Sequence, residues 1–375
     1  MERIALAYSG GLETSVAIPW LAEKHHAEIV AVTLDLGQGG ELEEVRDRAL
    51  ANGAVRAHVL DVREEFVRDY ILPSLKADAM YEKRSPMATA LARPLIAKRL
   101  VEIAVIEHAT AIAHGSSGKG HDRSPIDVAA SGLNPRIKII APVRDWGMTR
   151  AQQVDYAGAH DVRAPGADTP CRVRSNLWGR SIDCEVDLRA GPPEDLYALT
   201  KSPVECPDEP AYVKVAFARG LPAAINGVAM PLLELVGSLG IIAGAHGVGR
   251  LDVVENPAGA VQSRRVHEAP AAAVLHAAHQ ELQRLVTASD LGRVARTVSR
   301  QYADLVYNGL WFTPLRQALD ALVDKVQERV TGTIRMELFK GDCRIVGRES
   351  PHALEARAPE TAGSESTSRL RVVKG

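Results

Sequence analysis

Residues 7–15 read Ala-Tyr-Ser-Gly-Gly-Leu-Glu-Thr-Ser and separate an apolar run, Ile4–Tyr8, from a stretch with helical spacing, Thr14–Lys24. Two adjacent glycines let a backbone approach an anion closely, and the free N–H groups at the start of a helix point toward negative charge. Hydroxyl side chains are supplied by Ser9, Thr14 and Ser15. The stretch therefore predicts a phosphate-binding loop; the alternative is an ordinary strand–helix turn. No lysine follows the glycines, which excludes the G-x-x-x-x-G-K-[ST] loop.

Strand-like and helix-like segments alternate outward from this loop. Strands are predicted at Ile4–Tyr8, Glu28–Leu36, Val55–Val62, Ala111–His114 and Ile137–Pro142. Helices are predicted at Thr14–Lys24, Glu41–Asn52, Glu64–Met80 and Ala88–His108. This alternation indicates an α/β domain with a doubly wound parallel sheet, whose ligands bind at the carboxyl ends of the strands.

The sequence pattern changes at about Pro165, where Gly, Pro, Asp and Arg become frequent and strand-like and helix-like segments no longer alternate regularly. Further on we expect a strand at Tyr212–Ala218 and helices at Pro231–Leu239, Ala272–Val286 and Gln317–Val330. The predicted organisation is a nucleotide-binding domain over 1–168, a second α+β domain over 169–357 and a mobile tail over 358–375.

The composition is that of an ordinary globular protein: 375 residues, 46% hydrophobic and 25% charged, with a net charge of -2. This charge favours neither a nucleic-acid nor a membrane partner. No apolar run reaches the roughly 20 residues that span a bilayer, and the first residues lack a signal-peptide pattern. The four cysteines contain no CxxC pair, so neither a zinc site nor a disulfide framework is predicted, and a reducing cytoplasm is the expected location.

Many ordered motifs between Ile4 and Pro351 resemble one family. They are AYSGGLETS (7–15), LGQG (36–39), EEFVRDYI (64–71), LARPLIAK (91–98), IAHGSSGKGHD (112–122), KIIAP (138–142), NLWGRSI (176–182), HGVGRLDVVEN (246–256), YADLVYNGLW (302–311) and ERVTGTIRMELFKG (328–341). The first is similar to the SGGxDTS loop of ATP pyrophosphatases, and together they resemble argininosuccinate synthase. The resemblance implies a synthetase as the second domain.

The resemblance also implies a reaction. The ureido oxygen of citrulline attacks the α-phosphate of ATP to give an adenylate and pyrophosphate, and the amino group of aspartate then displaces AMP. ATP and Mg²⁺ are the implied cofactors, aspartate and citrulline or a related acceptor the substrates, and arginine biosynthesis the pathway. The match over Tyr302–Gly341 implies a homotetramer.

The ATP site that the resemblance implies is well matched. It comprises Ala7, Tyr8, Ser9, Gly10, Gly11, Leu12, Glu13, Thr14, Ser15, Leu34 and Gly115. One residue departs from the family, because Glu13 stands where its members have Asp. The carboxylate is kept but lies one methylene farther from the backbone. Glu13 and Asp122 are the implied catalytic residues.

The second glycine turn, 115–122, is implied to bind aspartate. Ser117 keeps the hydroxyl of the family's Thr, and Asp122 is kept, whereas His121 replaces an Asn. A solvated polar loop is the alternative.

The acceptor pocket departs most from the family. Ser85 replaces a Tyr, Ala90 a Ser and Pro125 an Arg, for which the nearby Arg123 is a possible substitute. Arg172 replaces a Ser, Arg174 an Asp and His267 a Tyr. Thr89 lies in the same pocket segment, and Ser181 and Glu255 remain as in the family. The new arginines would suit an acidic or phosphorylated acceptor.

Three hypotheses remain open from the residues. The chain is an argininosuccinate synthase whose unusual side chains fill the usual roles, a biosynthetic paralog with a non-citrulline acceptor, or a catalytically silent ATP-binding protein. Among the other histidines, His114 is interpreted with equal weight as a histidine of the protein core or as a residue of the ligand-binding site. The pair His276 and His279 is interpreted as a plain helix face rather than as a metal pair, and no metal-ligating residues are predicted.

Overall fold

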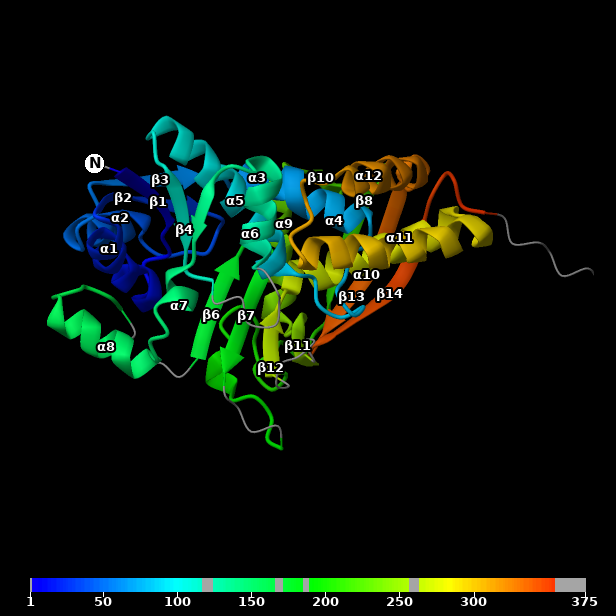
Figure 1. Cartoon of the computed structure of the whole chain (residues 1–375). Helices are drawn as coiled ribbons and strands as arrows, with labels where there is room; N and C mark the ends of the chain where they lie inside the picture. Colours follow the sequence, from blue (N-terminus) through cyan, green and yellow to red (C-terminus); the bar gives the residue numbers. More distant parts are fainter. Residues whose placement is uncertain (1, 117–123, 166–170, 185–188, 256–262, 355–375) are drawn as a thin grey trace, which may run out of the picture.

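The computed structural model describes residues 2–116, 124–165, 171–184, 189–255 and 263–354. These residues form one parallel and two antiparallel sheets. Figure 1 shows the parallel sheet and its helices at one end of the molecule, and the antiparallel sheets with long helices at the other.

The parallel sheet has the strand order β3-β2-β1-β4-β5. Its strands are β1 (Glu2–Ala7), β2 (Ala27–Asp35), β3 (Arg56–Asp61), β4 (Ala111–His114) and β5 (Lys138–Ile140). Its helices are α1 (Leu12–His25), α2 (Leu42–Ala51), α5 (Ala88–Ile106), α6 (Pro125–Leu133), α7 (Pro142–Asp145) and α8 (Arg150–Ala159). The strand order reverses between β1 and β4, so the predicted doubly wound α/β fold is confirmed.

Helices cover both faces of this sheet because its central strands are apolar on both sides. In β1, Leu6 packs in one buried cluster with Ile18 of α1, whereas Ala5 packs in another with Leu95 of α5. The carboxyl ends of β1 and β4 are neighbours, since Ala7 pairs with His114.

The helix predicted over Glu64–Met80 is found as a continuous helical stretch from Arg63 to Lys76, which ends earlier than predicted and is not α-helical throughout. The structure has three consecutive segments, α3 (Arg63–Phe66), the π-helical η1 (Val67–Ile71) and α4 (Leu72–Lys76). Pro73 lacks the N–H that would bond to Asp69, and its ring crowds that carbonyl in an α-helix. A wider turn immediately before the proline relieves this conflict.

The second half of the chain is α+β, as predicted. One sheet, ordered β10-β9-β8-β13-β14, contains β8 (Ala211–Ala218), β9 (Leu221–Ile225), β10 (Val228–Ala229), β13 (Gly332–Phe339) and β14 (Asp342–Glu349). The other, ordered β11-β12-β7-β6, contains β6 (Cys171–Asn176), β7 (Gly179–Cys184), β11 (Arg250–Glu255) and β12 (Ser263–Glu268). The helical segments are η2 (Glu194–Leu196), α9 (Leu232–Ala245), α10 (Pro270–Val286), α11 (Ser289–Tyr307) and α12 (Pro314–Gln327).

Helix α9 continues past its predicted end at Leu239. Glycine within a helix usually costs stability, but here it permits close packing. A Cβ on Gly244 would lie 2.1 Å from the carbonyl oxygen of Leu199. The glycine therefore lets the loop before β8 press against the helix.

The expected domain boundary near 165–172 falls between α8 and β6. The limits of the two domains stay a prediction, and most of the predicted tail lies outside the described residues. No helix in the described part of the chain is long and apolar enough to cross a membrane.

The expectation of no disulfide is wrong for Cys171, which is disulfide-bonded. Cys206 and Cys343 are free. The β6–β7 register sets Cys171 opposite the position of Cys184 on the neighbouring strand of the hairpin. Strand register, rather than a CxxC spacing, determines which positions of this hairpin face each other.

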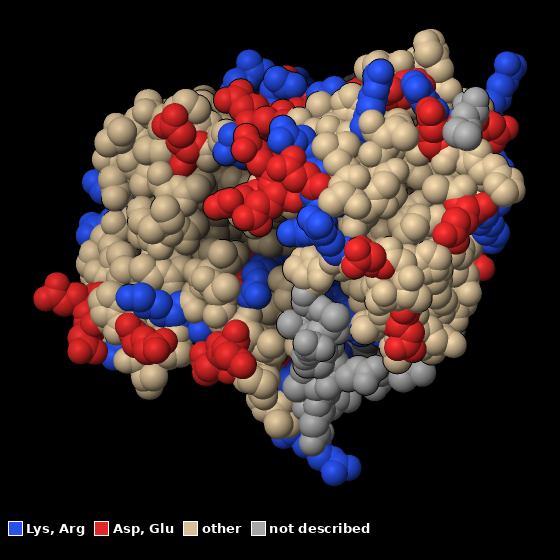
Figure 2. Space-filling model, turned by 90° about the vertical axis from the view of Figure 1, so that its left-hand side faces the viewer, with Lys and Arg blue, Asp and Glu red and all other residues tan. Residues whose placement is uncertain are grey.

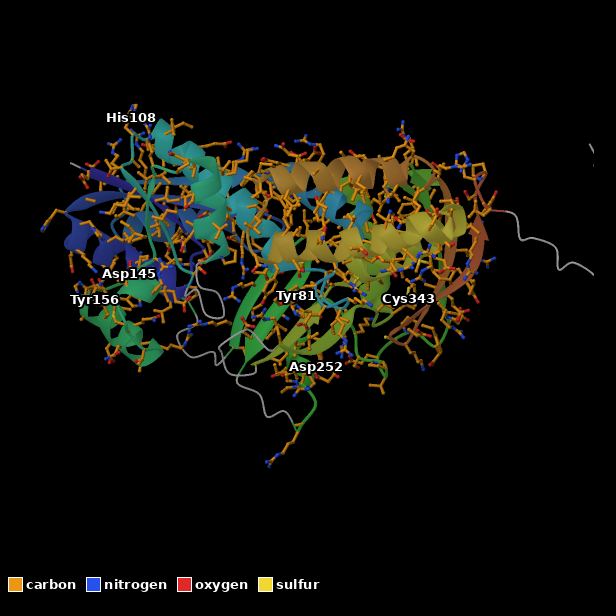
Figure 3. All side chains as sticks on the ribbon, turned by 45° about the vertical axis from the view of Figure 1, so that its right-hand side comes forward. Tyr81, His108, Asp145, Tyr156, Asp252 and Cys343 are labelled. Carbon is orange, nitrogen blue, oxygen red and sulfur yellow. The ribbon has the colours of Figure 1, made fainter. Side chains whose placement is uncertain are left out.

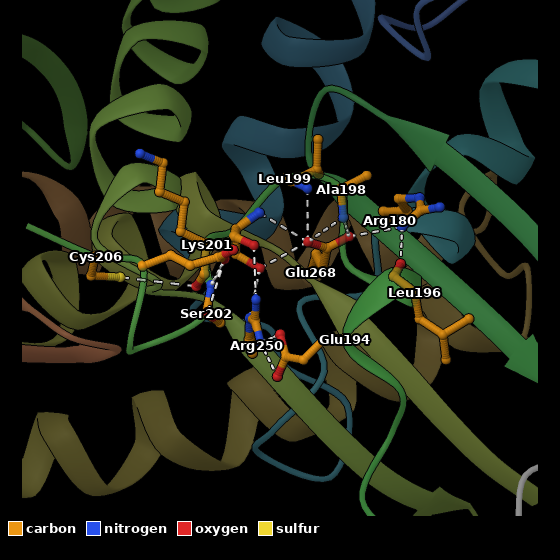
Figure 4. Close-up of polar contacts among 12 residues, drawn as sticks. Arg180, Glu194, Leu196, Ala198, Leu199, Lys201, Ser202, Cys206, Arg250 and Glu268 are labelled. Carbon is orange, nitrogen blue, oxygen red and sulfur yellow. Dashed lines mark hydrogen bonds and ion pairs between the residues drawn. The ribbon is translucent and has the colours of Figure 1, made fainter.

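Glu268, at the end of β12, is a fully buried carboxylate, and Figure 4 shows its surroundings. It accepts hydrogen bonds from the backbone N–H groups of Ala198, Leu199 and Thr200 at 2.8–3.0 Å and from the Thr200 hydroxyl at 2.8 Å. Arg180 of β7, its register partner, pairs with it at 2.9 Å. A buried charge is tolerated only when it is compensated in this way.

Replacing Glu268 with Gln is expected to lower the free energy of unfolding by about 3 kcal/mol, because the amide NH₂ would face N–H donors and Arg180 would lose its counterion. Urea denaturation would measure the change. Glu194→Gln is the matched control, since Glu194 pairs with Arg250 but is largely exposed, and should change stability by less than about 1 kcal/mol. Equal effects of the two variants would contradict the assignment of Glu268 as the compensated centre.

Candidate active site

The predicted phosphate loop lies at the point where the strand order reverses, between β1 and α1. Gly10 has φ +79°, and a Cβ there would come within 3.1 Å of Val45 and Arg48. Arg48 also donates to the carbonyl oxygen of Gly10 at 3.1 Å. The backbone at this position has a left-handed conformation and leaves no room for a side chain, which explains the glycine.

The loop hydroxyls fall into two groups. Ser9 Oγ and Thr14 Oγ1 lie 3.1 Å apart at the start of α1, where Ser9 is exposed. Ser15 is fully buried, and its hydroxyl lies 3.0 Å from the Tyr8 hydroxyl. Ser9 and Thr14 therefore line the loop, whereas Ser15 faces the interior.

The other residues of the predicted ATP site surround this loop. Ala7, Gly11 and Leu12 belong to the same strand–loop–helix unit, and Leu34 is buried near the carboxyl end of the adjacent β2. Gly115 follows β4, and a Cβ on it would lie 3.0 Å from Thr14. All the residues predicted to bind ATP thus lie at one edge of the sheet.

The second glycine turn begins beside the first. His114 is buried: its Nδ1 accepts from the N–H of Ser116 at 3.2 Å, so its Nε2 donates to Asp127 at 2.5 Å. Ser116 and Ser124 are hydrogen-bonded at 3.0 Å, which joins the two ends of the turn. Ser117, His121, Asp122 and Arg123 lie outside the described residues, so their roles stay predictions.

Asp127 is held by two partners, His114 and Arg144, the latter at 2.9 Å. Burial alone would raise the pKa of Asp127, but the hydrogen bonds from His114 and Arg144 outweigh it and bring the pKa down to about 2. Both ring nitrogens of His114 are therefore engaged by protein groups, so neither is free to bind a ligand.

Two departures from the family meet in space. Glu13, in the first turn of α1, lies 2.6 Å from the guanidinium of Arg172, on β6. The longer carboxylate side chain and the new arginine are thus partners that connect the phosphate loop to the second domain. An Asp and a Ser at these positions could not form this ion pair, so the two substitutions compensate each other.

A pocket with about 410 Å³ of empty space, part of it open to solvent, lies between the start of α5 and the sheet β11-β12-β7-β6. Six residues of the predicted acceptor site line it: Ser85, Thr89, Ala90, Arg174, Ser181 and His267. Pro125 begins α6, and the side chain of Glu255, at the end of β11, is not described. On the face shown in Figure 2, Lys and Arg side chains lie in and beside a hollow near the middle of the molecule, and Asp and Glu side chains lie along its upper rim.

Three of the predicted residues form one hydrogen-bonded chain. Thr89 donates to Ser181 at 3.2 Å, and Ser181 Oγ lies 2.9 Å from His267 Nδ1. Burial, with a contribution from Arg265, lowers the pKa of His267 to about 4, so its ring is neutral near pH 7. The other ring nitrogen, Nε2, is buried and has no hydrogen-bond partner within the described structure.

Sequence reasoning missed three residues of the pocket, Arg93, Arg265 and Tyr307. Arg265 precedes His267 by two, so strand periodicity alone would have assigned it to the same face. Tyr307 stacks on Tyr81 with ring centroids 3.8 Å apart, and Figure 3 shows Tyr81 between the long helices and the four-stranded sheet. No local pattern links the positions of Arg93 and Tyr307 to this pocket.

The pair His276 and His279 is buried in the core rather than on a plain helix face. His276 Nδ1 lies 3.1 Å from Asp78, and His279 Nε2 lies 2.8 Å from Gln327. No group of three or more His, Cys, Asp or Glu side chains within the described ranges is arranged to hold a metal.

Comparison with known proteins gives one consistent result. Residues 3–163 match the arginosuccinate synthase N-terminal HUP domain, and residues 172–371 match the arginosuccinate synthase C-terminal domain. The argininosuccinate synthase of Rubrobacter xylanophilus is 47% identical over 369 residues, which cover 98% of this chain and 90% of the relative. The argininosuccinate synthase of Symbiobacterium thermophilum is 47% identical over 357 residues, which cover 94% of this chain and 89% of that relative. A 4-thiouridine synthetase–RNA complex with bound ATP has a TM-score of only 0.32 at 19% identity, covering 43% of this chain and 41% of that chain.

The Asp127 contacts predict a pH dependence of stability. A pKa lowered from its ordinary value of 3.8 to about 2 stabilises the fold above pH 4, and this contribution is lost as the pH falls toward 2. The free energy of unfolding of the wild type should exceed that of Asp127→Asn by about 2 kcal/mol at pH 7 and by about half as much at pH 3. Urea denaturation at the two pH values would measure both differences. Asp145→Asn, beside the same Arg144, is the control (Figure 3). A difference independent of pH would refute the ion-pair assignment.

The Glu13–Arg172 pair predicts compensation. Arg172→Ser leaves Glu13 without its cation beside the phosphate loop and should raise the Kd for ATP about three- to tenfold, a modest change because both groups are partly exposed. Glu13→Asp combined with Arg172→Ser should restore the Kd to within about threefold. Isothermal titration calorimetry would measure both.

Arg174→Ser is the matched control on the same strand, since Arg174 pairs with Asp183 rather than with the loop. It should leave the Kd for ATP unchanged. If the effects of Glu13→Asp and Arg172→Ser on the Kd for ATP were additive in the double variant, Glu13 and Arg172 would act independently and the predicted compensation would be wrong.

Proposed function

The chain belongs to the argininosuccinate synthase family, and we propose that it joins aspartate to a citrulline-type ureido acceptor in an ATP-dependent reaction. The acceptor is activated as an adenylate, and AMP and pyrophosphate are released. The observation that carries this proposal is the continuity of the two sites. Arg172 reaches the phosphate loop, while Arg174, two residues along the same strand, lines the pocket.

In the first step the ureido oxygen forms a bond to the α-phosphorus of ATP, and the bond between the α- and β-phosphates breaks. Pyrophosphate leaves with the electron pair of that bond, so negative charge develops on its bridging oxygen. The N–H groups at the start of α1 and the hydroxyls of Ser9 and Thr14 would hold the phosphates. Arg172 keeps the Glu13 carboxylate neutralised beside this charge.

In the second step the amino nitrogen of aspartate bonds to the ureido carbon, and the bond from that carbon to the adenylate oxygen breaks. AMP leaves with the oxygen, and the nitrogen loses a proton to solvent. Alignment of acceptor and ATP before reaction supplies much of the rate gain in such a sequence. His114 would contribute by orienting the turn that carries the proposed aspartate residues Ser117 and Asp122.

Mg²⁺ is proposed to enter with ATP and to neutralise charge on the phosphates. Glu13 is the carboxylate in the first turn of α1, and it fits a role near this ion only in part, because Arg172 already pairs with it. The oxygen ligands that Mg²⁺ prefers would then come chiefly from the nucleotide and water.

The remaining assignments rest on the family. A homotetramer, a cytoplasmic location and a role in arginine biosynthesis are proposed on that basis. The domain limits 1–168 and 169–357 are likewise a proposal, supported by the change from the parallel sheet with its helices to the antiparallel strands that begin at β6.

The proposal predicts pyrophosphate release that depends on ATP, Mg²⁺, aspartate and citrulline together, at roughly 1 per second or more. A coupled pyrophosphate assay would follow the rate, and mass spectrometry would identify argininosuccinate. Reactions without acceptor and without aspartate are the controls. Nucleotide binding without pyrophosphate release in any mixture would overturn the proposal in favour of a silent ATP-binding protein.

A further inference from the structure

The turn between β6 and β7 touches the segments that lead into both proposed ligand sites. It consists of Leu177 and Trp178, and the flanking residues Asn176 and Gly179 are register partners. Trp178 is 1% exposed, and its backbone N–H donates to the side-chain oxygen of Asn176 at 2.9 Å. A two-residue turn that is tied to its own strand in this way is expected to move as one body.

On one side, Leu177 is fitted against the segment that follows β2. Its N–H donates to the carbonyl oxygen of Leu36 at 2.8 Å, and a Cβ on Gly37 would lie 2.3 Å from its Cγ. Gly37 also has φ +79°, so both its conformation and the Leu177 side chain exclude any residue but glycine. Leu177 therefore covers the backbone directly beyond Leu34, the residue predicted to lie near the adenine.

Side chains of this segment fix its shape. Gln38 accepts from the N–H of Leu36 at 2.7 Å and donates to the carbonyl oxygen of Leu34 at 2.8 Å. Asp35 accepts from the N–H of Gly37 at 2.8 Å. Because these bonds join the ends of the segment, a ligand that packs against Leu34 also fixes the carbonyl oxygen that accepts from the turn.

On its other side, the turn holds the start of α5. The side-chain amide of Asn176 donates to the carbonyl oxygen of Ala88 at 2.8 Å, and the indole N–H of Trp178 donates to that of Pro86 at 3.0 Å. Both donors are buried, so loss of either bond would leave a polar group without water to replace its partner.

Met87, between these two carbonyl groups, is held in an unfavourable conformation. It is buried and has a left-handed φ of +58°. A non-glycine residue rarely adopts this conformation and keeps it only where its surroundings hold it. Thr89 and Ala90 follow directly and line the acceptor pocket. The hydrogen bonds from the turn therefore set the position at which the pocket begins.

We propose that Leu177 is a positioning residue that couples the nucleotide site to the acceptor pocket, so that ATP and the acceptor bind cooperatively. The inference deepens the proposed function and rests on it for the identity of the acceptor. A nucleotide against Leu34 keeps the turn seated on Leu36, and the seated turn keeps the carbonyl groups of Pro86 and Ala88 in place. By linkage, an acceptor in the pocket strengthens nucleotide binding by the same factor.

Calorimetry tests the coupling. The Kd of the α,β-methylene analogue of ATP, which does not react, is measured with and without saturating citrulline. In the wild type, citrulline should lower this Kd at least about fivefold. Leu177→Ala should reduce the effect to less than about twofold, yet leave the Kd of each ligand alone within about threefold, because Leu177 does not line the acceptor pocket. No coupling in the wild type, or undiminished coupling in Leu177→Ala, would overturn the inference.

Two control variants separate positioning from stability. Leu177→Met keeps an apolar side chain of similar volume and should preserve the coupling. Leu285→Ala removes another partly buried leucine, near the end of α10, whose carbonyl oxygen accepts from Leu354. It should lower the Tm but preserve the coupling. If Leu285→Ala abolished the coupling as Leu177→Ala does, the effect would reflect general stability and the inference would be wrong.

Failure of the proposed function is recognised separately. If citrulline does not bind while the ATP analogue does, the acceptor is wrong, and hydrogen exchange with the analogue alone then decides the inference. The analogue should slow exchange of the Leu177 N–H at least about tenfold, because it fixes the carbonyl group of Leu36. The N–H of Asn226, which donates to Lys214 in the other antiparallel sheet, is the reference and should not change. Unchanged exchange at Leu177 would overturn the inference.

Discussion

The pairing of β7 with β12 is the constraint on which the candidate site depends. On one face of this pair, Arg180 and the buried Glu268 form an ion pair that is completed by backbone N–H groups. On the other face, the next residues, Ser181 and His267, are hydrogen-bonded at the pocket. A shift of one residue in register would exchange the two faces. Such a shift would bury the pocket residues and move the Glu268 carboxylate away from the backbone N–H groups that donate to it. Because losing these hydrogen bonds is costly, the burial of Glu268 fixes the register and with it the position of the pocket.

The second constraint is the contact between this sheet and the phosphate loop. The parallel sheet brings the loop to its edge through local rules, because β1 and β4 are neighbours and their carboxyl ends coincide. Nothing in those rules determines where the second domain sits. The ion pair between Glu13 and Arg172 is one direct link, and it crosses from the first turn of α1 to the strand that also carries Arg174. Binding at the two sites is therefore expected to be coupled through one strand.

Much of the first domain could be predicted from the sequence because its signals are local. The bounds of Ala111–His114 were predicted without error, and the glycine loop lies between strand and helix as expected. The interruption by η1 was missed because a proline in a helical pattern can be accommodated in several ways. The hairpin β6–β7 was not predicted, since Arg172 and Arg174 lie on a strand with little apolar alternation. The partners of the pocket, such as Asp183 with Arg265, depend on register, which no single segment encodes.

The departures from the family illustrate the difference between substitutions considered singly and in pairs. Considered singly, Glu13 suggests an altered metal geometry, and Arg172 and Arg174 suggest two new cations facing the acceptor. In the structure Arg172 pairs with Glu13, so neither charge is left uncompensated and the loop keeps its electrostatic balance. Arg174 lines the acceptor pocket instead, where it shares Asp183 with the neighbouring Arg265. Two arginines that look alike in the sequence therefore have different surroundings, one at the phosphate loop and one at the acceptor pocket.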